Sequence, residues 1–111
     1  RSALHVQQAQ LQPDDRRIEL TQAELGRVLA GSGRHREAVT LLRASLESRQ
    51  RRGASPASVA IAQTRLGASL GALGRREEAV ALLRPALATL MAERGPDDPR
   101  TREARQALGG P

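Results

Sequence analysis

The sequence contains the stretch GRHREAVTLLR at residues 33–43 and a near copy, GRREEAVALLR, at residues 74–84. The similarity continues outside these two stretches. Leu25-Gly26 returns as Leu66-Gly67 and again as Leu108-Gly109, and four-residue marks recur as RSAL (1–4), RASL (43–46) and RPAL (84–87). A nearly constant step between such copies indicates that one supersecondary unit is repeated along the chain.

Each unit has the pattern of two helices. Apolar residues recur at three- and four-residue spacings, and glycine or proline–aspartate clusters interrupt them at matching places. Gly31, Gly33 and Gly74 are expected to end helices, and the helix starts are expected at Pro13-Asp14-Asp15, Ser55-Pro56 and Pro96-Asp97-Asp98-Pro99. The pattern predicts helices at about 1–11, 15–30, 35–52, 56–72, 75–94 and 98–108.

Alanine and leucine must form the core, because the chain contains no aromatic residue and no cysteine. Small and medium apolar side chains pack well between helices, whereas strands favour β-branched and aromatic residues. The sequence therefore predicts an all-α fold with Leu42 and Leu83 buried between helices. We expect one domain over residues 1–111, made of the trailing half of a preceding repeat (1–12), two full repeats (13–53 and 54–94), and the leading helix of a third repeat or a cap (95–111).

The units at the two ends of such a stack are expected to leave apolar surface uncovered. A single helical hairpin cannot bury its apolar stripe, so stability comes from stacking of neighbouring units. We therefore expect self-association through the exposed repeat ends.

In the residues that recur in both units, the chain resembles the tetratricopeptide repeat family. The family's spacing of small and bulky residues is matched in both units, at Leu25, Gly26, Leu29, Ala38, Leu42 and Ser45, and at Leu66, Gly67, Leu70, Ala79, Leu83 and Ala86. The long period and the linker GPDDP (95–99) are similar to those of the kinesin-light-chain subtype. The resemblance implies a superhelix of stacked antiparallel helix hairpins, an α-solenoid, whose concave face is lined by the first helix of each pair and holds a peptide or protein segment.

The resemblance also assigns contact positions on the concave face. Arg27 is the expected charge anchor of this face, and Arg65 is a second expected contact. The subtype often has asparagines just before the repeat leucine, where this chain has Ala23-Glu24, Thr64-Arg65 and Gln106-Ala107. The positions assigned to the groove are Leu20, Ala23, Arg27, Ala30, Ile61, Thr64, Ala68 and Ala72, and Glu103 and Gln106 would extend the strip.

Few residues offer catalytic or metal-binding chemistry. His5 and His35 are far apart, and neither has a carboxylate or second histidine at metal spacing, so His35 is interpreted as a solvated turn residue. Gly31-Ser32-Gly33-Arg34 lacks the Gly-Lys-Ser/Thr of a phosphate loop, and the paired aspartates are explained as helix caps. We expect no enzyme activity, no cofactor and no metal.

The basic charge of the chain is compatible with two kinds of partner, a protein or a nucleic acid. All 18 basic residues are arginine and the net charge is +6, a composition that codon bias toward G and C would produce. The leading hypothesis is a cytoplasmic interaction module that holds an acidic or extended segment of a protein or peptide. Chains resembling this subtype occur in larger bacterial signalling proteins, such as serine/threonine kinases and signalling ATPases. The alternative is a basic module that contacts nucleic acid through phosphates, although the chain lacks the aromatic residues that usually stack on bases.

No apolar run is long enough for a membrane span.

Overall fold

The structure, a computed structural model, describes residues 16–109, and within them every regular element is a helix. The all-α prediction is confirmed, and the helix ends lie within about two residues of those predicted from the sequence. The helix expected at 1–11 lies outside the described residues. The observed helices are α2 (Arg16–Gly31), α3 (His35–Arg51), α4 (Pro56–Ala72), α5 (Arg76–Arg94) and α6 (Pro99–Ala107).

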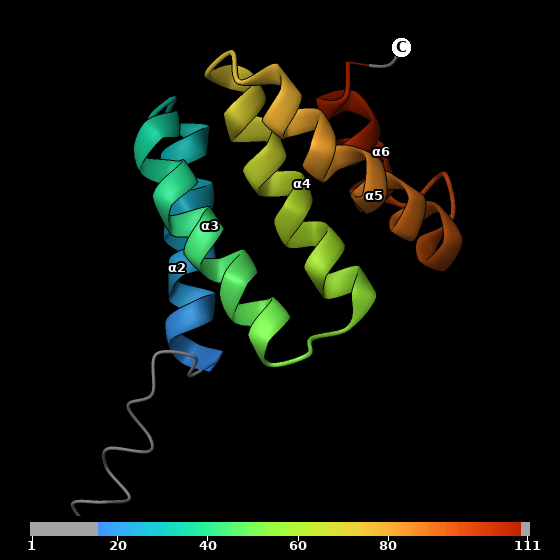
Figure 1. The fold of residues 1–111 in the computed structure, drawn as a ribbon, viewed down its shortest axis with the longest axis horizontal. Helices are drawn as coiled ribbons and strands as arrows, with labels where there is room; N and C mark the ends of the chain where they lie inside the picture. Colours follow the sequence, from blue (N-terminus) through green and yellow to red (C-terminus); the bar gives the residue numbers. More distant parts are fainter. Residues whose placement is uncertain (1–15, 110–111) are drawn as a thin grey trace, which may run out of the picture.

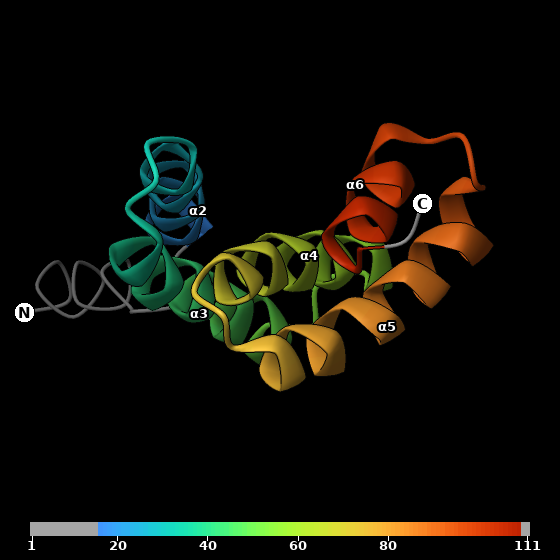
Figure 2. The same ribbon diagram turned by 90° about the horizontal axis from the view of Figure 1, so that it is seen from above.

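The helices form two layers. Each helix packs against the next one along the chain, and α4 also contacts α2 and α6. Figure 1 shows α3 and α4 side by side with their connection at one end. In the perpendicular view of Figure 2, α2, α4 and α6 line one side of the molecule, and α3 and α5 line the other. The first helix of each hairpin therefore faces one common surface.

Two helix starts use the caps that the sequence predicts. Ser55 precedes α4, and its Oγ accepts a hydrogen bond of 3.2 Å from the backbone N–H of Ser58. Asp98 precedes α6, and its Oδ1 accepts from the N–H of Arg100 at 2.8 Å. Each cap satisfies an amide that the helix leaves unpaired. The equivalent Asp14 and Asp15 lie outside the described residues.

The turn that closes each hairpin has the same hydrogen bonds in both units. The N–H of Arg34 donates to the carbonyl of Leu29, and the N–H of Arg75 donates to the carbonyl of Leu70, each at 2.9 Å. The intervening Gly33 and Gly74 have φ of 82° and 81°. This is the Schellman ending of a helix, in which a glycine with positive φ lets the chain reverse into the next helix.

Alanine at position 74 is expected to lower the free energy of unfolding by about 1–2 kcal/mol, because an L residue is strained at this positive φ. Gly71 gives a matched control, since it lies inside α4 and a Cβ there would make an ordinary van der Waals contact, 3.8 Å from the Cβ of Ala79. Gly71→Ala is expected to be neutral or stabilising. Urea denaturation of the two variants compares these effects, and equal losses would contradict the turn assignment.

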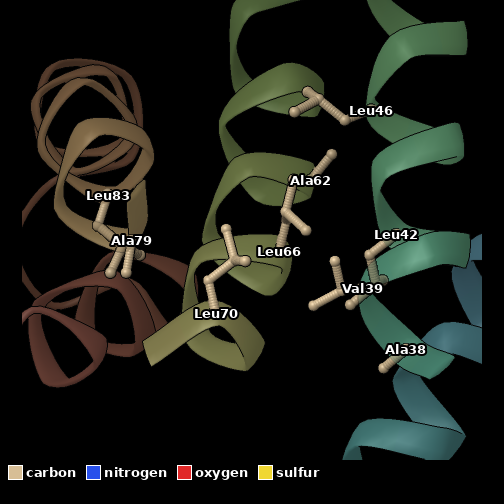
Figure 3. Close-up of a cluster of buried hydrophobic side chains, with 9 residues drawn as sticks. All are labelled: Ala38, Val39, Leu42, Leu46, Ala62, Leu66, Leu70, Ala79 and Leu83. Atoms are coloured by element: carbon tan, nitrogen blue, oxygen red, sulfur yellow. The ribbon is translucent and has the colours of Figure 1, made fainter. Parts of the chain in front are cut away.

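The core forms where leucines of the second helix of each hairpin lie over glycines of the first. A Cβ on Gly26 would lie 2.8 Å from Leu42 Cγ, and one on Gly67 would lie 2.7 Å from Leu83 Cγ. Leu42 and Leu83 are 2% and 0% exposed, which confirms their predicted burial. The same core cluster joins α3, α4 and α5 and contains Ala38, Val39, Leu42, Leu46, Ala62, Leu66, Leu70, Ala79 and Leu83 (Figure 3).

Candidate functional site

The surface shared by α2, α4 and α6 contains a pocket of about 270 Å³. It brings together five of the residues that sequence reasoning placed on the concave face: Arg27, Ala30, Arg65, Ala68 and Glu103. Leu20, Ile61, Ala72 and Gln106 do not line it. The remaining lining residues are Gly31, His35, Leu42 and Ser69, of which His35 and Leu42 come from α3.

Two residues assigned to the concave surface are buried. Ala23 is 5% exposed and Thr64 is 2% exposed, and the Thr64 Oγ1 donates to the carbonyl of Ala60 within its own helix at 2.9 Å. Ala23 shares a helical stripe with Gly26, the glycine against which Leu42 packs. These two side chains therefore offer almost no surface to a partner, and we exclude them from the contact set.

Arg27, the charge anchor expected from the sequence, already has a partner on its own helix. Its guanidinium lies 2.5 Å from the carboxylate of Glu24, one turn earlier, and both side chains are more than half exposed. The Glu24 hydrogen bond raises the pKa of Arg27, and the Arg27 hydrogen bond lowers the pKa of Glu24. A ligand carboxylate at Arg27 would have to compete with Glu24.

Arg65 differs from Arg27 in its burial and in its charged neighbours. It is partly buried, and no carboxylate among residues 16–109 forms an ion pair with it. Burial lowers the pKa of the Arg65 guanidinium, repulsion from Arg100 lowers it further, and Glu103 partly opposes these effects. An arginine remains protonated at neutral pH even so. The pocket therefore holds a fixed positive charge that the surrounding protein only partly compensates.

A second cluster of charges lies in the contact of α2 with the end of α3, around a buried glutamate that sequence reasoning did not identify. Glu19 is fully buried, and its carboxylate accepts four hydrogen bonds of 2.6–3.0 Å from Arg52. Arg49 Nε lies 3.8 Å from Glu19 Oε2, and Arg49 also donates to the carbonyl of Ser58 in α4 at 2.8 Å. Repulsion from Arg49 is one of the smaller effects that lower the pKa of Arg65.

The arrangement of small residues, stacked hairpins and capped turns agrees with a comparison against protein families. A family model described as tetratricopeptide repeat matches residues 20–52 and 59–100, more than half of the chain. The chain belongs to the tetratricopeptide repeat family. Tetratricopeptide repeats generally mediate protein–protein interaction, and the family is typically non-catalytic. Searches of curated proteins and of solved structures found no match.

His35 has a role within the tetratricopeptide stack that the sequence did not show. The expectation of a solvated turn residue is wrong, because α3 begins at His35 and the residue is only partly exposed. Its Nδ1 lies 3.3 Å from the Oγ of Ser69 in α4. Ser69 is 1% exposed, so the contact joins two hairpins beneath the pocket.

Three arginines outside this tetratricopeptide face are paired within the protein. Arg34 pairs with Glu37 at 2.6 Å, and Arg75 pairs with Glu78 at 2.6 Å. Arg76 donates to the carbonyl of Leu108 at the end of α6 at 2.7 Å. Each of these three arginines therefore has a partner within the protein. In the part of the chain that the structure describes, no helix is long and apolar enough to cross a membrane, and no cluster of three or more His, Asp or Glu could hold a metal.

Proposed function

We propose that this chain is a non-catalytic scaffold module that holds an acidic protein segment on the face formed by α2, α4 and α6. The observation that carries this proposal is the partly buried Arg65, which lies in a pocket and has no ion-pair partner among the described residues. A carboxylate there would offset the repulsion from Arg100 and accept charge-assisted hydrogen bonds.

The rest of the pocket suits an extended segment. Ala30 and Ala68 are small, so a partner's backbone can approach the helices closely. Leu42 also lines the pocket, but at 2% exposure it offers almost no surface to a partner. Arg27 and Glu103 stand at the pocket with opposite charges, which restricts where a second acidic side chain can bind. Our proposed contact set is Arg65, Ala68, Ala30 and Arg27, which line the pocket, together with Leu20 and Ile61, which the family resemblance assigns to the same face.

Arg65→Glu is expected to weaken binding of an acidic peptide at least about tenfold, since hydrogen bonds to charged groups contribute roughly 1.5–3 kcal/mol. The probe is a fluorescent peptide of alternating Glu and Ala residues, compared with the peptide in which Gln replaces Glu. Fluorescence anisotropy measures both affinities.

Arg84→Glu is the matched control for this prediction. It makes the same change of charge on an exposed part of α5, which does not line the pocket. Equal losses for Arg65→Glu and Arg84→Glu would mean that net charge alone attracts the peptide. Equal affinities for the Glu and Gln peptides would contradict the acidic ligand.

Capture from a lysate of the source organism addresses the natural partner and the competing function together. The wild-type chain, Arg65→Glu and Arg84→Glu are used as baits, with and without nuclease and at two salt concentrations. The scaffold proposal predicts proteins that stay bound to the wild-type bait after nuclease treatment. The same proteins should bind the Arg84→Glu bait and should not bind the Arg65→Glu bait. Recovery of nucleic acid alone, lost steeply as salt rises, would favour the phosphate-contacting module instead.

The resemblance to the kinesin-light-chain subtype supports a proposal about the source, the location and the parent protein of this chain. We infer a bacterial source, a cytoplasmic location and a place within a larger signalling or regulatory protein. We also retain the division into repeats at 13–53 and 54–94 with a leading helix at 95–111. Self-association through exposed repeat ends stays a prediction, and sedimentation velocity at two protein concentrations checks it.

A further inference from the structure

Arg100 lies in the first turn of α6, where a positive charge is unfavourable. A cation near the N-terminus of a helix meets the positive end of the helix dipole. The residue is only partly exposed, and among residues 16–109 its side chain has neither an ion-pair partner nor a hydrogen-bond acceptor. Arg100 is therefore a second arginine, besides Arg65, whose charge is left without a bound anion in the described part of the chain.

Arg100 and Arg65 lie near each other on the surface formed by α2, α4 and α6 (Figure 2). Arg65 lines the pocket, and so does Glu103, which follows Arg100 by one turn of α6 and shares its side of the helix. Repulsion from Arg100 lowers the pKa of Arg65, and it also lowers the pKa of Arg49 at the end of α3. The packing of α3, α4 and α6 thus brings three arginines together at the edge of the pocket.

The carboxylates around these arginines are too few to balance them. Glu103 is the one carboxylate of the described residues whose attraction raises the pKa of Arg65, and none of them pairs with Arg100. The buried cluster around Glu19 likewise has two arginines for one carboxylate. Each group has one cation more than it has anions, so an anion with two charges would balance both.

A phosphate monoester matches this excess better than a carboxylate does. It carries a charge of about −1.5 to −2 at neutral pH and three acceptor oxygens, so it can bind two guanidinium groups at once. A carboxylate carries a single charge and commonly forms a bidentate pair with one arginine. A nucleic-acid phosphodiester also carries a single charge, and the chain has no aromatic residue on which bases could stack.

We infer, on the basis of the function proposed above, that the acidic group held on this face is the phosphate of a phosphoserine or phosphothreonine in the bound segment. Arg65 in α4 and Arg100 in α6 donate hydrogen bonds to the phosphate oxygens. The pocket of about 270 Å³ beside Arg65 receives the adjoining backbone, because Ala30 and Ala68 are small. Phosphorylation of the partner then controls its binding.

Three fluorescent peptides of alternating Glu and Ala residues test this inference. They differ only at the centre, which is glutamate, phosphoserine or serine, and fluorescence anisotropy measures their affinities. The phosphoserine peptide is expected to bind at least about tenfold more tightly than the glutamate peptide, because it gains the hydrogen bonds of a second arginine. The serine peptide is expected to bind no more tightly than the glutamate peptide.

Two variants on α6 separate the role of Arg100 from that of net charge. Arg100→Gln should reduce the preference for phosphoserine to about threefold or less, since only Arg65 then remains for the phosphate. Its affinity for the glutamate peptide should change little. Arg102→Gln is the matched control and should keep the preference, because Arg102 is exposed on the same helix and does not line the pocket.

The Tm of each variant, followed by circular dichroism, shows whether it is folded. Arg100→Gln should not lower Tm, because it removes a cation from a helix N-terminus. A lower Tm for Arg100→Gln than for Arg102→Gln would overturn the inference, since Arg100 would then already be satisfied within the protein.

The binding outcomes separate this inference from the proposed function. Binding of the glutamate peptide with less than about threefold preference for phosphoserine would overturn the inference and leave the proposed function standing. Failure of both acidic peptides to bind would overturn both. A preference that Arg100→Gln keeps, or that Arg102→Gln also loses, would overturn the role of Arg100. A fluorescent oligothymidine that binds as tightly as the phosphoserine peptide would assign these arginines to nucleic acid instead.

Discussion

Replacing Glu19 by alanine is expected to lower the free energy of unfolding by about 3–5 kcal/mol, because it leaves a buried cation without its partner. Glu19 is 0% exposed, and the side chain of Arg49 beside it is 10% exposed. Burial lowers the pKa of Arg49, and the Glu19 carboxylate is the group that opposes this effect. Arg49 Nε has no hydrogen-bond partner in the described structure, and the Ser58 carbonyl that accepts from the same guanidinium carries no charge that could replace that of Glu19. Urea denaturation followed by circular dichroism measures the loss.

Two further variants show whether the buried charge is the cause. Glu24→Ala removes a carboxylate from the same helix, but its ion pair with Arg27 is exposed, so stability should be nearly unchanged. In an Arg49→Met background, Glu19→Ala should cost less than in the wild type, because one buried cation is already absent. An equal cost in both backgrounds would mean that Glu19 acts only through Arg52 or through packing.

The repeated features of the fold could be predicted from the sequence because each occurs twice. The turn at Gly33 and the turn at Gly74 have the same hydrogen bonds, and Leu42 and Leu83 lie over equivalent glycines. When the same residue type occupies equivalent positions in both repeats, it is more easily recognised as a requirement of the fold than a residue that occurs once. The helix ends were predicted closely for the same reason.

Features that occur in only one repeat were missed. Glu19 corresponds to Ala60 in the second unit, so no repetition marks it as buried. One signal was available, since Glu19, Ala23 and Gly26 have the spacing of a single helical stripe and the latter two are small. That stripe is the one that faces α3.

The pocket could be predicted only in part, because it depends on how neighbouring units stack. Arg27 was the expected anchor, but its pairing with Glu24 follows from a spacing of three residues on one helix. The partial burial of Arg65 and the repulsion from Arg100 need both α4 and α6 in place. Sequence reasoning named both arginines but took Arg27 as the charge anchor, because neither the Glu24 pairing of Arg27 nor the partial burial of Arg65 was considered.

Leu83→Ala is expected to lower the free energy of unfolding by about 2–5 kcal/mol, since it removes a fully buried side chain and leaves a cavity. Leu83 is 0% exposed and lies over Gly67, which has no side chain that could move into the vacated space. The loss should therefore fall in the upper half of that range. Leu20→Ala, at a residue that is 53% exposed, is the control and should have a small effect.

The contact between Leu83 and Gly67 can be isolated by a double-mutant cycle. Gly67→Ala alone is expected to destabilise by about 1–3 kcal/mol, because the added methyl would crowd a packed leucine. In the Leu83→Ala background the same methyl enters the cavity, so its cost should disappear or become a gain. The two substitutions therefore compensate each other if α4 and α5 approach as closely as the structure shows. Simple additivity of the two losses would contradict that approach, and with it the glycine-over-leucine packing that sets the spacing of both hairpins.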